Sequence, residues 1–576
     1  MVTKHFAYWP KRVPHSLTIP ETTLCYNLDV SATRYPNKTA IVYYGRKITY
    51  RELAAEVGRL AGYLERSGVK RGDRVLLLMQ NSPQFIIGFY AILRANAVVV
   101  PLNSMLVTSE LRYYAQDSQA ELVLVGQDVY PQVAPLLREG MVRRAVVAAY
   151  SDYRGEPPGG LGFPVPEVVT AEREAREAIA EPGVTLWADA LAAGTAIGEP
   201  GPLLVGPDDL AVLPYTSGTT GNPKGCMHSH RTVMANVVGG VTWNQASSER
   251  VVLAALPLFH VTGMQGSMNA PIYRGACVVL MTRWNRDAAA ELIQRERVTG
   301  WGNISTMMID FLANPRIEEY DLSSLEGIGG GGAPLPAAVG ERLLAMTGLH
   351  YVEGYGLSET MAQTHANPSD RPKMQCLGIP VFDVDAQVVE PTTLEELGPN
   401  RDGEILVSGP QLFLGYWNKP DETAQAFVEL EGKRFLRTGD LGHYDEEGYF
   451  FHTDRLKRMI NASGYKVWPA EVETLLYRHP AVQEACVIAS PDERRGETVK
   501  ALVVLRESHR STTTPEEIMA WARGEMAAYK CPRSVEIVEG LPKSASGKVL
   551  WRVLQEQERE GMTRALGAQT QAGAGE

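Results

Sequence analysis

The chain has 576 residues, more than one hydrophobic core usually organises, so two or more domains are expected. Hydrophobic residues make up 44% and charged residues 21%, as in ordinary globular proteins. The formal net charge of −11 argues against a nucleic-acid partner bound through phosphate neutralisation.

The cysteines and the N-terminal residues indicate the cellular compartment in which the protein is expected. The six cysteines include no CxxC pair, so no zinc or redox motif is indicated, and a reducing compartment is expected. The N-terminus lacks the apolar region of a secretory signal. The longest apolar segment, residues 85–93, is shorter than the about 20 residues that cross a bilayer. We therefore expect a cytoplasmic protein without a transmembrane segment. His228 and His230 lie two residues apart, as on one face of a strand, but no further metal-ligand pattern accompanies them, so we interpret both as structural.

Strand-like and helix-like patterns alternate through the first part of the chain. Helical periodicity predicts helices over 50–67 and 82–96, and short apolar runs predict strands over 75–79, 97–100, 122–125 and 142–147. This alternation favours parallel sheets covered by helices. Residues 152–208, rich in Pro and Gly and with a charged helix-like run at 171–180, are predicted to form a surface excursion between two α/β subdomains.

A separate pattern follows Asp454. Helices are predicted over 469–478 and 515–526, and strands over 482–488 and 499–505. The fold class is therefore α/β: a large N-terminal domain of α/β subdomains (1–454) and a small C-terminal α+β domain (455–560). The tail 561–576, rich in Gly, Ala and Gln, is predicted to be disordered.

Residues 215–225, Tyr-Thr-Ser-Gly-Thr-Thr-Gly-Asn-Pro-Lys-Gly, carry the most chemistry. Glycines let backbone N–H groups turn toward an anion, hydroxyls add donors, and a lysine adds charge. The spacing differs from the Walker pattern, because Lys224 is followed by glycine and cysteine. Ordinary turns use the same residues, but eleven in a row favour a polyphosphate site over a plain surface loop.

This loop resembles the phosphate loop of the adenylate-forming superfamily, which contains acyl-CoA synthetases, peptide-synthetase adenylation domains and beetle luciferases. Segments similar to the family's acyl-site, adenine, phosphate, ribose, hinge and catalytic-lysine motifs follow in its order, at 256–264, 329–334, 355–360, 437–441, 454–457 and 541–548. The resemblance spans residues 25–555 and is greatest to fatty-acyl-CoA synthetases. It implies ATP, Mg²⁺ and coenzyme A as cofactors and a C-terminal domain that moves between two half-reactions.

The resemblance also implies an ATP site. The β- and γ-phosphates would be bound by Thr216, Ser217, Gly218, Thr219, Thr220 and Lys224. Thr360 would contact the α-phosphate, and Glu359 with Thr216 would hold Mg²⁺. Adenine would lie against backbone and an aromatic ring provided by Gly331, Gly332, Ala333, Pro334, Tyr355 and Gly356, with a helix beginning at Pro334.

The resemblance further implies residues that bind the ribose, activate the carboxylate and admit the thiol of coenzyme A. Asp440 would accept from the ribose hydroxyls, and Arg455 would reach the ribose or phosphate. Lys548 would bridge the carboxylate and the α-phosphate during adenylation, and Gly464 would line the pantetheine tunnel. Lys457 would be the hinge residue, although a solvated lysine fits the pattern equally well.

The acyl pocket is expected beside the motif at 256–264. His260 would position the reacting carboxylate rather than act as an acid or base. The predicted lining also includes Val261, Gly263, Met264, Trp301, Asn303, Gly331, Gly356 and Leu357. Trp301 would form the pocket floor, the alternative being that it packs in the core.

These residues predict an AMP-forming acyl-CoA synthetase that activates an aliphatic or fatty acid with ATP and transfers the acyl group to coenzyme A. Two alternatives stay open: an enzyme that loads an acyl group onto a carrier protein, and a ligase for a short branched or hydroxy acid. A catalytically silent relative is disfavoured because the reactive positions are present. Chain length is not set by the sequence, and a homodimer is left open.

Overall fold

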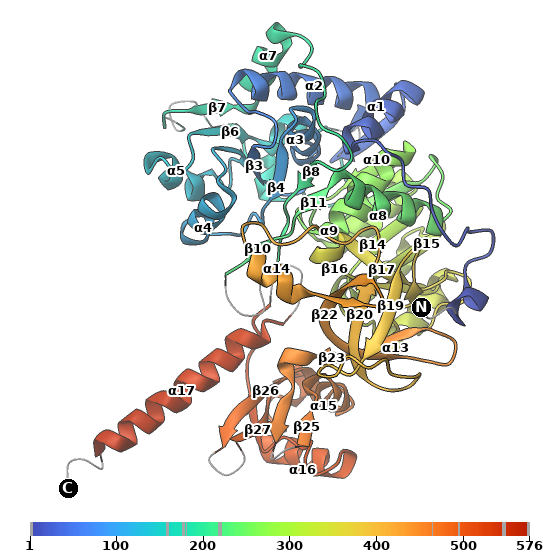
Figure 1. The fold of residues 1–576 in the computed structure, drawn as a ribbon, viewed down its shortest axis with the longest axis vertical. Helices are drawn as coiled ribbons and strands as arrows, with labels where there is room; N and C mark the ends of the chain where they lie inside the picture. Colours follow the sequence, from blue (N-terminus) through green and yellow to red (C-terminus); the bar gives the residue numbers. More distant parts are fainter. Residues whose placement is uncertain are drawn as a thin grey trace. The chain divides into compact units, whose positions relative to one another are not determined.

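The computed structural model describes residues 4–156, 160–174, 179, 181–216, 222–462, 465–492, 496–543 and 549–572 (Figure 1). Contacts within the chain divide it into two compact units. Unit 1 contains Met1–Ala386, Val407–Arg437 and Glu447–Phe450, and unit 2 contains Gln387–Leu406, Thr438–Glu446 and Phe451–Glu576. The domain boundary predicted after Asp454 lies inside unit 2, close to the point where the chain re-enters it at Phe451.

Unit 1 contains a seven-stranded sheet in the order β11-β8-β4-β3-β5-β6-β7. Its strands are β3 (Arg74–Leu78), β4 (Val98–Pro101), β5 (Leu122–Gly126), β6 (Arg144–Ala148), β7 (Val184–Leu186), β8 (Leu210–Val212) and β11 (His228–Ser229). All neighbours pair in parallel except β11 with β8. The four strands predicted from apolar runs are confirmed, since β3 to β6 are buried on both faces.

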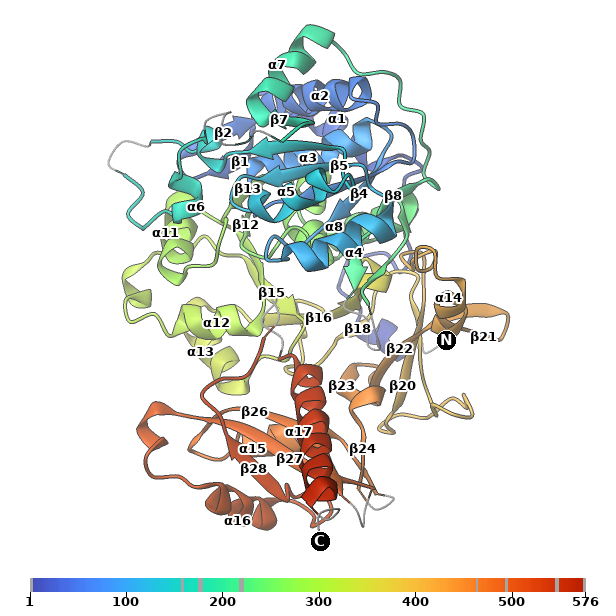
Figure 2. The same ribbon diagram turned by 90° about the vertical axis from the view of Figure 1, so that its left-hand side faces the viewer.

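Helices cover both faces of this sheet (Figure 2). One face packs on α1 (Leu24–Arg34), α2 (Tyr50–Arg66) and α3 (Pro83–Arg94), and the other on α4 (Thr108–Ser118) and α5 (Tyr130–Arg138). The predicted helices α2 and α3 begin at capping residues: Thr49 forms a capping box with Glu52, and Ser82 accepts from Phe85 N ahead of Pro83.

The segment predicted to be a surface excursion is partly structural. Residues 184–186 add β7 to the sheet edge, and α7 (Trp187–Ile197) packs on α2 with the Trp187 side chain buried. A Cβ on Gly194 would lie 2.0 Å from Arg59 O, so a glycine permits this close approach. The prediction of a surface excursion is wrong for these residues, because the high Pro and Gly content of the segment was taken to indicate a loop although it also contains a short strand and a helix. The run at 171–180 follows α6 (Glu167–Thr170), and residues 175–178 and 180 lie outside the described residues.

A nine-stranded sheet forms the second layer of unit 1, in the order β18-β17-β16-β15-β14-β12-β13-β1-β2. Its strands are β1 (Thr39–Tyr43), β2 (Arg46–Thr49), β12 (Val251–Ala254), β13 (Cys277–Leu280), β14 (Gly300–Asn303), β15 (Gly327–Gly331), β16 (Tyr351–Leu357), β17 (Ala362–Ala366) and β18 (Ile379–Pro380). One face packs on α11 (Arg286–Glu296), α12 (Ser305–Leu312) and α13 (Ala337–Thr347). The other face contributes to the core between the two sheets.

The core between the sheets also contains α8 (His230–Trp243), α9 (Val261–Gly263), the π-helix η4 (Met264–Asn269) and α10 (Ala270–Arg274). The remaining elements of unit 1 include the hairpin β9 (Tyr215–Thr216) and β10 (Lys224–Gly225), the helix α14 (Pro420–Ala426), β21 (Phe427–Leu430) and the 3-10 turns η1 (Lys4–Tyr8), η2 (Tyr150–Tyr153), η5 (Ile317–Glu319) and η6 (Ser358–Thr360). Strands β19 (Asp385–Val389), β20 (Gly403–Ser408), β22 (Lys433–Tyr444) and β23 (Phe450–Arg455) contain residues of both units.

Unit 2 contains a five-stranded sheet in the order β25-β24-β27-β26, with β28 paired to β27. The strands are β24 (Ile460–Ala462), β25 (Tyr465–Val467), β26 (Val482–Asp492), β27 (Gly496–Leu505) and β28 (Ser534–Ile537). Helices α15 (Pro469–Leu476) and α16 (Pro515–Glu525) pack on one face, and η7 (Leu456–Arg458) and η8 (Glu507–His509) are 3-10 turns. The predicted C-terminal α+β pattern is confirmed.

The last helix, α17 (Trp551–Ala572), packs its first turns on β26 and extends into the predicted disordered tail. Alanine, glutamine and arginine are favourable helix residues, which accounts for the longer helix. In the part of the chain that the structure describes, no helix is both long enough and apolar enough to span a bilayer.

Candidate active site

The described residues of the phosphate loop form the two strands of a short hairpin. Thr216 ends β9 and Lys224 begins β10, and the two pair directly in antiparallel register. Tyr215 donates its hydroxyl hydrogen to Asp117 Oδ2 of α4 at 2.6 Å, which anchors the base of the hairpin. Other residues of the predicted loop lie outside the described residues: Ser217, Gly218, Thr219 and Thr220.

Tyr416 connects two of the predicted ATP-site residues. Its hydroxyl donates to Glu359 Oε1 at 2.8 Å, and the Lys224 ammonium lies 5.0 Å from the centroid of its ring. Burial, followed by the Glu359 charge, raises the pKa of Tyr416, so the hydroxyl remains a donor. The structure thus brings the predicted phosphate lysine and the predicted metal carboxylate to the same tyrosine, which the sequence did not single out.

The residues at this position fit a nucleotide-held Mg²⁺. Among the described residues, no group of three His, Cys, Asp or Glu could form a metal cage. Magnesium bound with nucleotides instead uses one or two protein carboxylates together with phosphate oxygens and water. Glu359 would be such a carboxylate, and Thr216 lies on the hairpin opposite Lys224. When bound, Mg²⁺ would neutralise charge on the phosphates.

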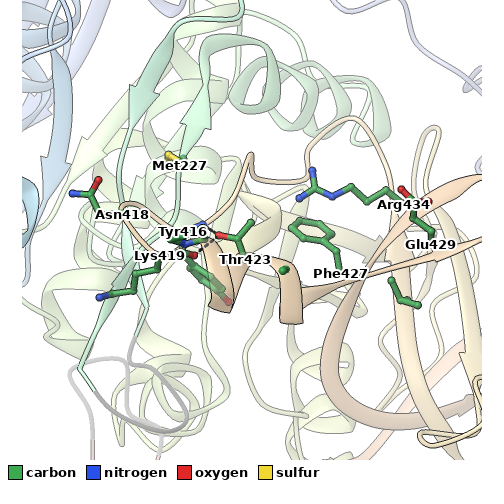
Figure 3. Close-up of a pocket in the computed structure, with 11 residues that line it drawn as sticks. Met227, Tyr416, Asn418, Lys419, Thr423, Phe427, Glu429 and Arg434 are labelled. Atoms are coloured by element: carbon green, nitrogen blue, oxygen red, sulfur yellow. Dashed lines mark hydrogen bonds between the residues drawn. The ribbon is translucent and has the colours of Figure 1, made fainter.

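A groove of about 570 Å³ borders Tyr416 on the side of α14 (Figure 3). Thr423 fixes its wall by accepting from Tyr416 N at 2.9 Å and donating to Lys419 O at 2.8 Å. The Arg434 guanidinium lies 3.4 Å from the centroid of the Phe427 ring at its other end. None of the residues lining this groove belongs to β14, β15 or β16, so it is separate from the predicted acyl pocket.

Thr360 is buried, and its hydroxyl contacts the backbone. Its Oγ1 accepts from Leu357 N at 2.9 Å and lies 2.7 Å from Ala362 O, to which it can donate. Asn236 of α8 donates to Thr360 O and Met361 O, both at 2.8 Å. This network fixes the turn after β16 that carries Glu359. Contact between Thr360 and the α-phosphate stays a prediction.

The predicted adenine segment is an extended strand that ends in a turn. Strand β15 ends at Gly331, and Gly332 follows with φ +88°. Ala333 and Pro334 are exposed, and helix α13 begins at Ala337, so the predicted helix start at Pro334 is wrong. Proline can occupy a first helical turn, but here Pro336 takes the N-cap position.

Tyr355 lies at the end of β16, directly opposite His365 of β17. A Cβ on the next residue, Gly356, would lie 1.4 Å from Ala362 O, so only glycine fits at this crossing. Leu357 is half-buried beyond it. The half-buried Tyr355 ring and the glycine turn after β15 lie on neighbouring strands of unit 1, as the adenine prediction requires.

One face of β14, β15 and β16 is nearly free of side chains. The residues that alternate onto it are Gly300, Gly302, Gly327, Gly329, Gly331, Val352 and Gly354. A Cβ on Gly300, Gly302 or Gly327 would meet no atom within 4 Å. The face therefore borders open space, and we call it the glycine face.

Trp301 and Asn303 alternate onto the opposite face. The Trp301 ring is buried, stacked on Trp284 with centroids 5.5 Å apart, and contacts Phe311 edge-on at 5.0 Å. Asn303 Oδ1 accepts from the Tyr351 hydroxyl at 3.0 Å. These positions favour the core-packing alternative for Trp301 over a pocket floor, and Asn303 is likewise turned away from the glycine face.

The acyl motif lies on the same side of the sheet as the glycine face. Val261 and Met264 belong to the core that Ala254 of β12 also joins, and Gly300 shares the Ala254 face through its pairing with Val252. A Cβ on Gly263 would lie 2.3 Å from Pro257 O, so this position needs glycine. His260 is half-buried at the N-cap of α9. The structure thus gathers this motif and the glycines into one region of unit 1.

The predicted ribose residues meet inside unit 2. Arg455 Nε lies 2.9 Å from Asp440 Oδ1, and His452 Nε2 lies 3.7 Å from the same oxygen. Asp440 is almost fully buried, and the Arg455 guanidinium holds its carboxylate in place. Gly464 and Lys548 lie outside the described residues, and Lys457 is described only through the backbone of η7.

Sequence reasoning also missed that His228 contacts the turn that carries Glu359, while the nearby His230 contacts α1. His228 Nε2 lies 2.8 Å from Ser358 O in the turn that precedes Glu359, and His230 Nδ1 accepts from Leu24 N at 3.2 Å. Both are buried, as their interpretation as structural residues requires; His228 lies on β11, and His230 begins α8. The one signal in the sequence that could have indicated this contact of His228 is its position just after the phosphate hairpin.

Comparison with known families and proteins agrees with these motifs. The family model described as AMP-binding enzyme matches residues 28–417, and the model described as AMP-binding enzyme C-terminal domain matches residues 471–548. A long-chain-fatty-acid–CoA ligase from Bacillus subtilis (strain 168) is 36% identical over 96% of this chain and 98% of its own length. A feruloyl-CoA synthase from Amycolatopsis sp. is 34% identical over 89% of this chain and 95% of its own length.

A solved structure extends the comparison to the fold. ATP-bound MatB from Rhodopseudomonas palustris superposes with a TM-score of 0.80 at 29% identity, covering 94% of this chain and 99% of that one. The matched families span most of the chain and include the hairpin, the Glu359 turn and the glycine face. The chain therefore belongs to the AMP-binding enzyme family and is an AMP-forming acid–CoA ligase that uses ATP, Mg²⁺ and coenzyme A.

Proposed function

We propose that the acid activated by this ligase is an aliphatic one, a fatty acid, and that its chain lies along the glycine face. The single observation that carries this proposal is the open space beside Gly300, Gly302 and Gly327. Apart from glycines, the face presents Val352, so nothing on it would pair with a second charge or hydroxyl on the substrate. Each methylene that leaves water for an apolar surface contributes about 0.8 kcal/mol, which favours long chains in such a space.

A flat aromatic acid is the competing substrate, because feruloyl-CoA synthase is also a relative and a side-chain-free sheet accepts a planar ring. The short hydroxy acid is less favoured, since Asn303 is bonded to Tyr351.

Pyrophosphate release measured with a panel of acids, with and without coenzyme A, tests the proposal. Saturated acids of increasing length should give rising kcat/KM, and coenzyme A should accelerate turnover. Preference for cinnamic-type acids would replace the aliphatic proposal.

A glycine substitution links this preference to the glycine face. Gly302→Val should fill part of the open space and shift the optimum toward shorter acids, by about fourfold in kcat/KM per excluded methylene. Gly524→Ala, at an open helical position in unit 2, is the matched control and should leave the profile unchanged. An unchanged profile for Gly302→Val would remove the glycine face from the pocket.

We further propose that the remaining residue roles follow the family pattern. Lys548 would act in adenylation, Lys457 would be the hinge, and Asp440 with Arg455 would bind the ribose and phosphate. The pairing of the buried Asp440 carboxylate with Arg455 supports the last of these. The roles of Gly464 and His260 stay predictions.

The compartment and the assembly state are proposals of the same kind. All six cysteines are free and buried, which supports a cytoplasmic location. The homodimer left open by the sequence is checked by light scattering of the purified protein.

A further inference from the structure

The tyrosine predicted to contact adenine is connected to a row of buried rings. The Tyr355 and His365 rings have centroids 5.7 Å apart at an interplanar angle of 59°, and the His365 and Phe450 rings are 4.6 Å apart at 54°. His365 and Phe450 have no exposed surface. All three residues belong to unit 1, so the row is internal to one compact body.

Tyr355 has a ring neighbour on the adjacent strand β17. Gly354 belongs to the glycine face, so Tyr355, the next residue of β16, alternates onto the opposite face. His365 stands directly opposite Tyr355 on β17, so its ring is the cross-strand neighbour on the same face. The Tyr355 ring therefore packs against the histidine, and this contact limits its orientation.

The neighbouring residue Thr364 holds His365 through a ring nitrogen. Its Nδ1 lies 3.0 Å from Thr364 Oγ1, and that hydroxyl also lies 3.4 Å from Tyr355 O. Burial lowers the pKa of His365 to about 3, so the ring is neutral at physiological pH and packs without a charge that would need solvation.

Phe450, behind His365, is fixed through its backbone. Its N–H donates to Gly378 O at 2.8 Å, and its carbonyl accepts from Leu377 N at 2.8 Å. The next ring along the chain, Tyr449, lies 5.8 Å from Tyr8 of the N-terminal turn η1. The support for Tyr355 thus rests on backbone-anchored residues rather than on mobile side chains.

We propose that His365 is a positioning residue for ATP: it fixes the Tyr355 ring in the orientation that receives adenine. This inference rests on the proposed role of Tyr355 in the ATP site. An aromatic contact of this kind, once removed, should weaken ATP binding by roughly three- to tenfold. Binding of the acid should be unaffected, because His365 lies on β17 and not on the strands of the glycine face.

The test is pyrophosphate exchange with His365→Ala, His365→Phe and His365→Leu, measuring KM for ATP and for the acid separately. His365→Ala should raise KM for ATP roughly three- to tenfold and leave KM for the acid unchanged. His365→Phe should restore most of the ATP affinity because it keeps a ring, and His365→Leu should fall between the two. If His365→Ala does not fold, the comparison of the leucine and phenylalanine variants decides.

Phe89→Leu, a buried truncation in the core between the sheets, is the control for lost stability. It should lower Tm and leave both KM values unchanged. Equal increases of both KM values in the His365 variants, or an unchanged KM for ATP, would overturn the inference. A wild-type protein that releases no pyrophosphate with any acid would instead contradict the proposed function, so the two failures are distinguishable.

Discussion

The carboxylate of Asp454 accepts a hydrogen bond from the backbone N–H of Ala470 at 2.7 Å and so caps the first turn of α15. Four residues later, Arg458 forms a bidentate pair with Glu473 of the same helix and donates to Val487 O at 3.1 Å. The two residues that flank the segment around Lys457 are therefore tied to one helix of unit 2. Rotation of the backbone at Lys457 has to break the cap at Asp454 or the pair at Arg458.

Lys457→Pro should permit adenylation and stall thioester formation, because proline fixes φ near roughly −65° and restricts the change between two conformations. The two half-reactions are measured separately, as pyrophosphate release and as thioester yield from a preformed adenylate. Lys457→Ala is the control and should leave both rates near those of wild type. Unchanged overall turnover of the proline variant would exclude Lys457 as the pivot.

Lys548→Ala should reduce adenylate formation by roughly 10²-fold or more, because a positioned cation that meets developing charge contributes several kcal/mol. Thioester formation from the preformed adenylate should be retained. Lys543→Ala, five residues earlier and paired with Glu484 at 2.8 Å, is the control and should have little effect. Equal losses in both steps would indicate that Lys548 acts structurally.

Tyr416→Phe should raise the Mg²⁺ concentration needed for half-maximal adenylation by about tenfold, because a residue that orients a metal ligand contributes on this scale. The phenylalanine keeps the ring beneath Lys224 and removes the donor to Glu359. Titration of pyrophosphate release with Mg²⁺ measures the effect. Tyr63→Phe, which loses a hydroxyl contact to Thr185 elsewhere in unit 1, should not shift the titration.

Trp301→Ala should reduce the free energy of unfolding by about 3–5 kcal/mol, because it empties a buried site between Trp284 and Phe311. The chain-length profile of the acids should stay the same. Denaturant unfolding and the acid panel check the two parts. A shift toward longer acids at unchanged stability would restore the pocket-floor interpretation.

Stability should fall as the pH drops from about 6.5 toward 4. Burial lowers the pKa of His228 and of His230 to about 4. Below pH 6.5 these histidines are protonated in the unfolded chain but stay neutral in the folded chain. Each histidine therefore lowers the free energy of unfolding by up to about 3 kcal/mol as the pH falls across this range. His230→Asn keeps an acceptor for Leu24 N and should flatten the dependence. An equally steep loss in this variant would assign the acid sensitivity to other groups.

The elements that the sequence predicted best are those whose side chains alone set the structure. Strand β5 is a continuous apolar run, and α2 begins at a Thr-x-x-Glu box, so burial and capping define both without tertiary information. The motifs predicted to bind the phosphates and Mg²⁺ were inferred from local segments in the same way. The Glu359 turn and the Lys224 hairpin are local segments, and the fold brings them to one tyrosine.

The predictions that failed concern the direction of side chains and the contacts between segments far apart in the chain. The direction of Trp301 depends on strand register, which a single segment does not encode, so the pocket floor could not be told from the core. Tyr416 was missed because its role comes from a partner far away in the chain. The start of α13 was predicted at Pro334 instead of Ala337 because proline is compatible with both an N-cap and a first turn.

The glycine face also limits how the substrate range of this enzyme can change. Glycine is the smallest residue, so every substitution at Gly300, Gly302 or Gly327 removes volume from the space beside the sheet. Mutation there can narrow the range of acids but cannot widen it. Acceptance of a bulkier acid has to come from the wall that faces the glycines, where Val261 and Met264 still carry side chains that can be shortened.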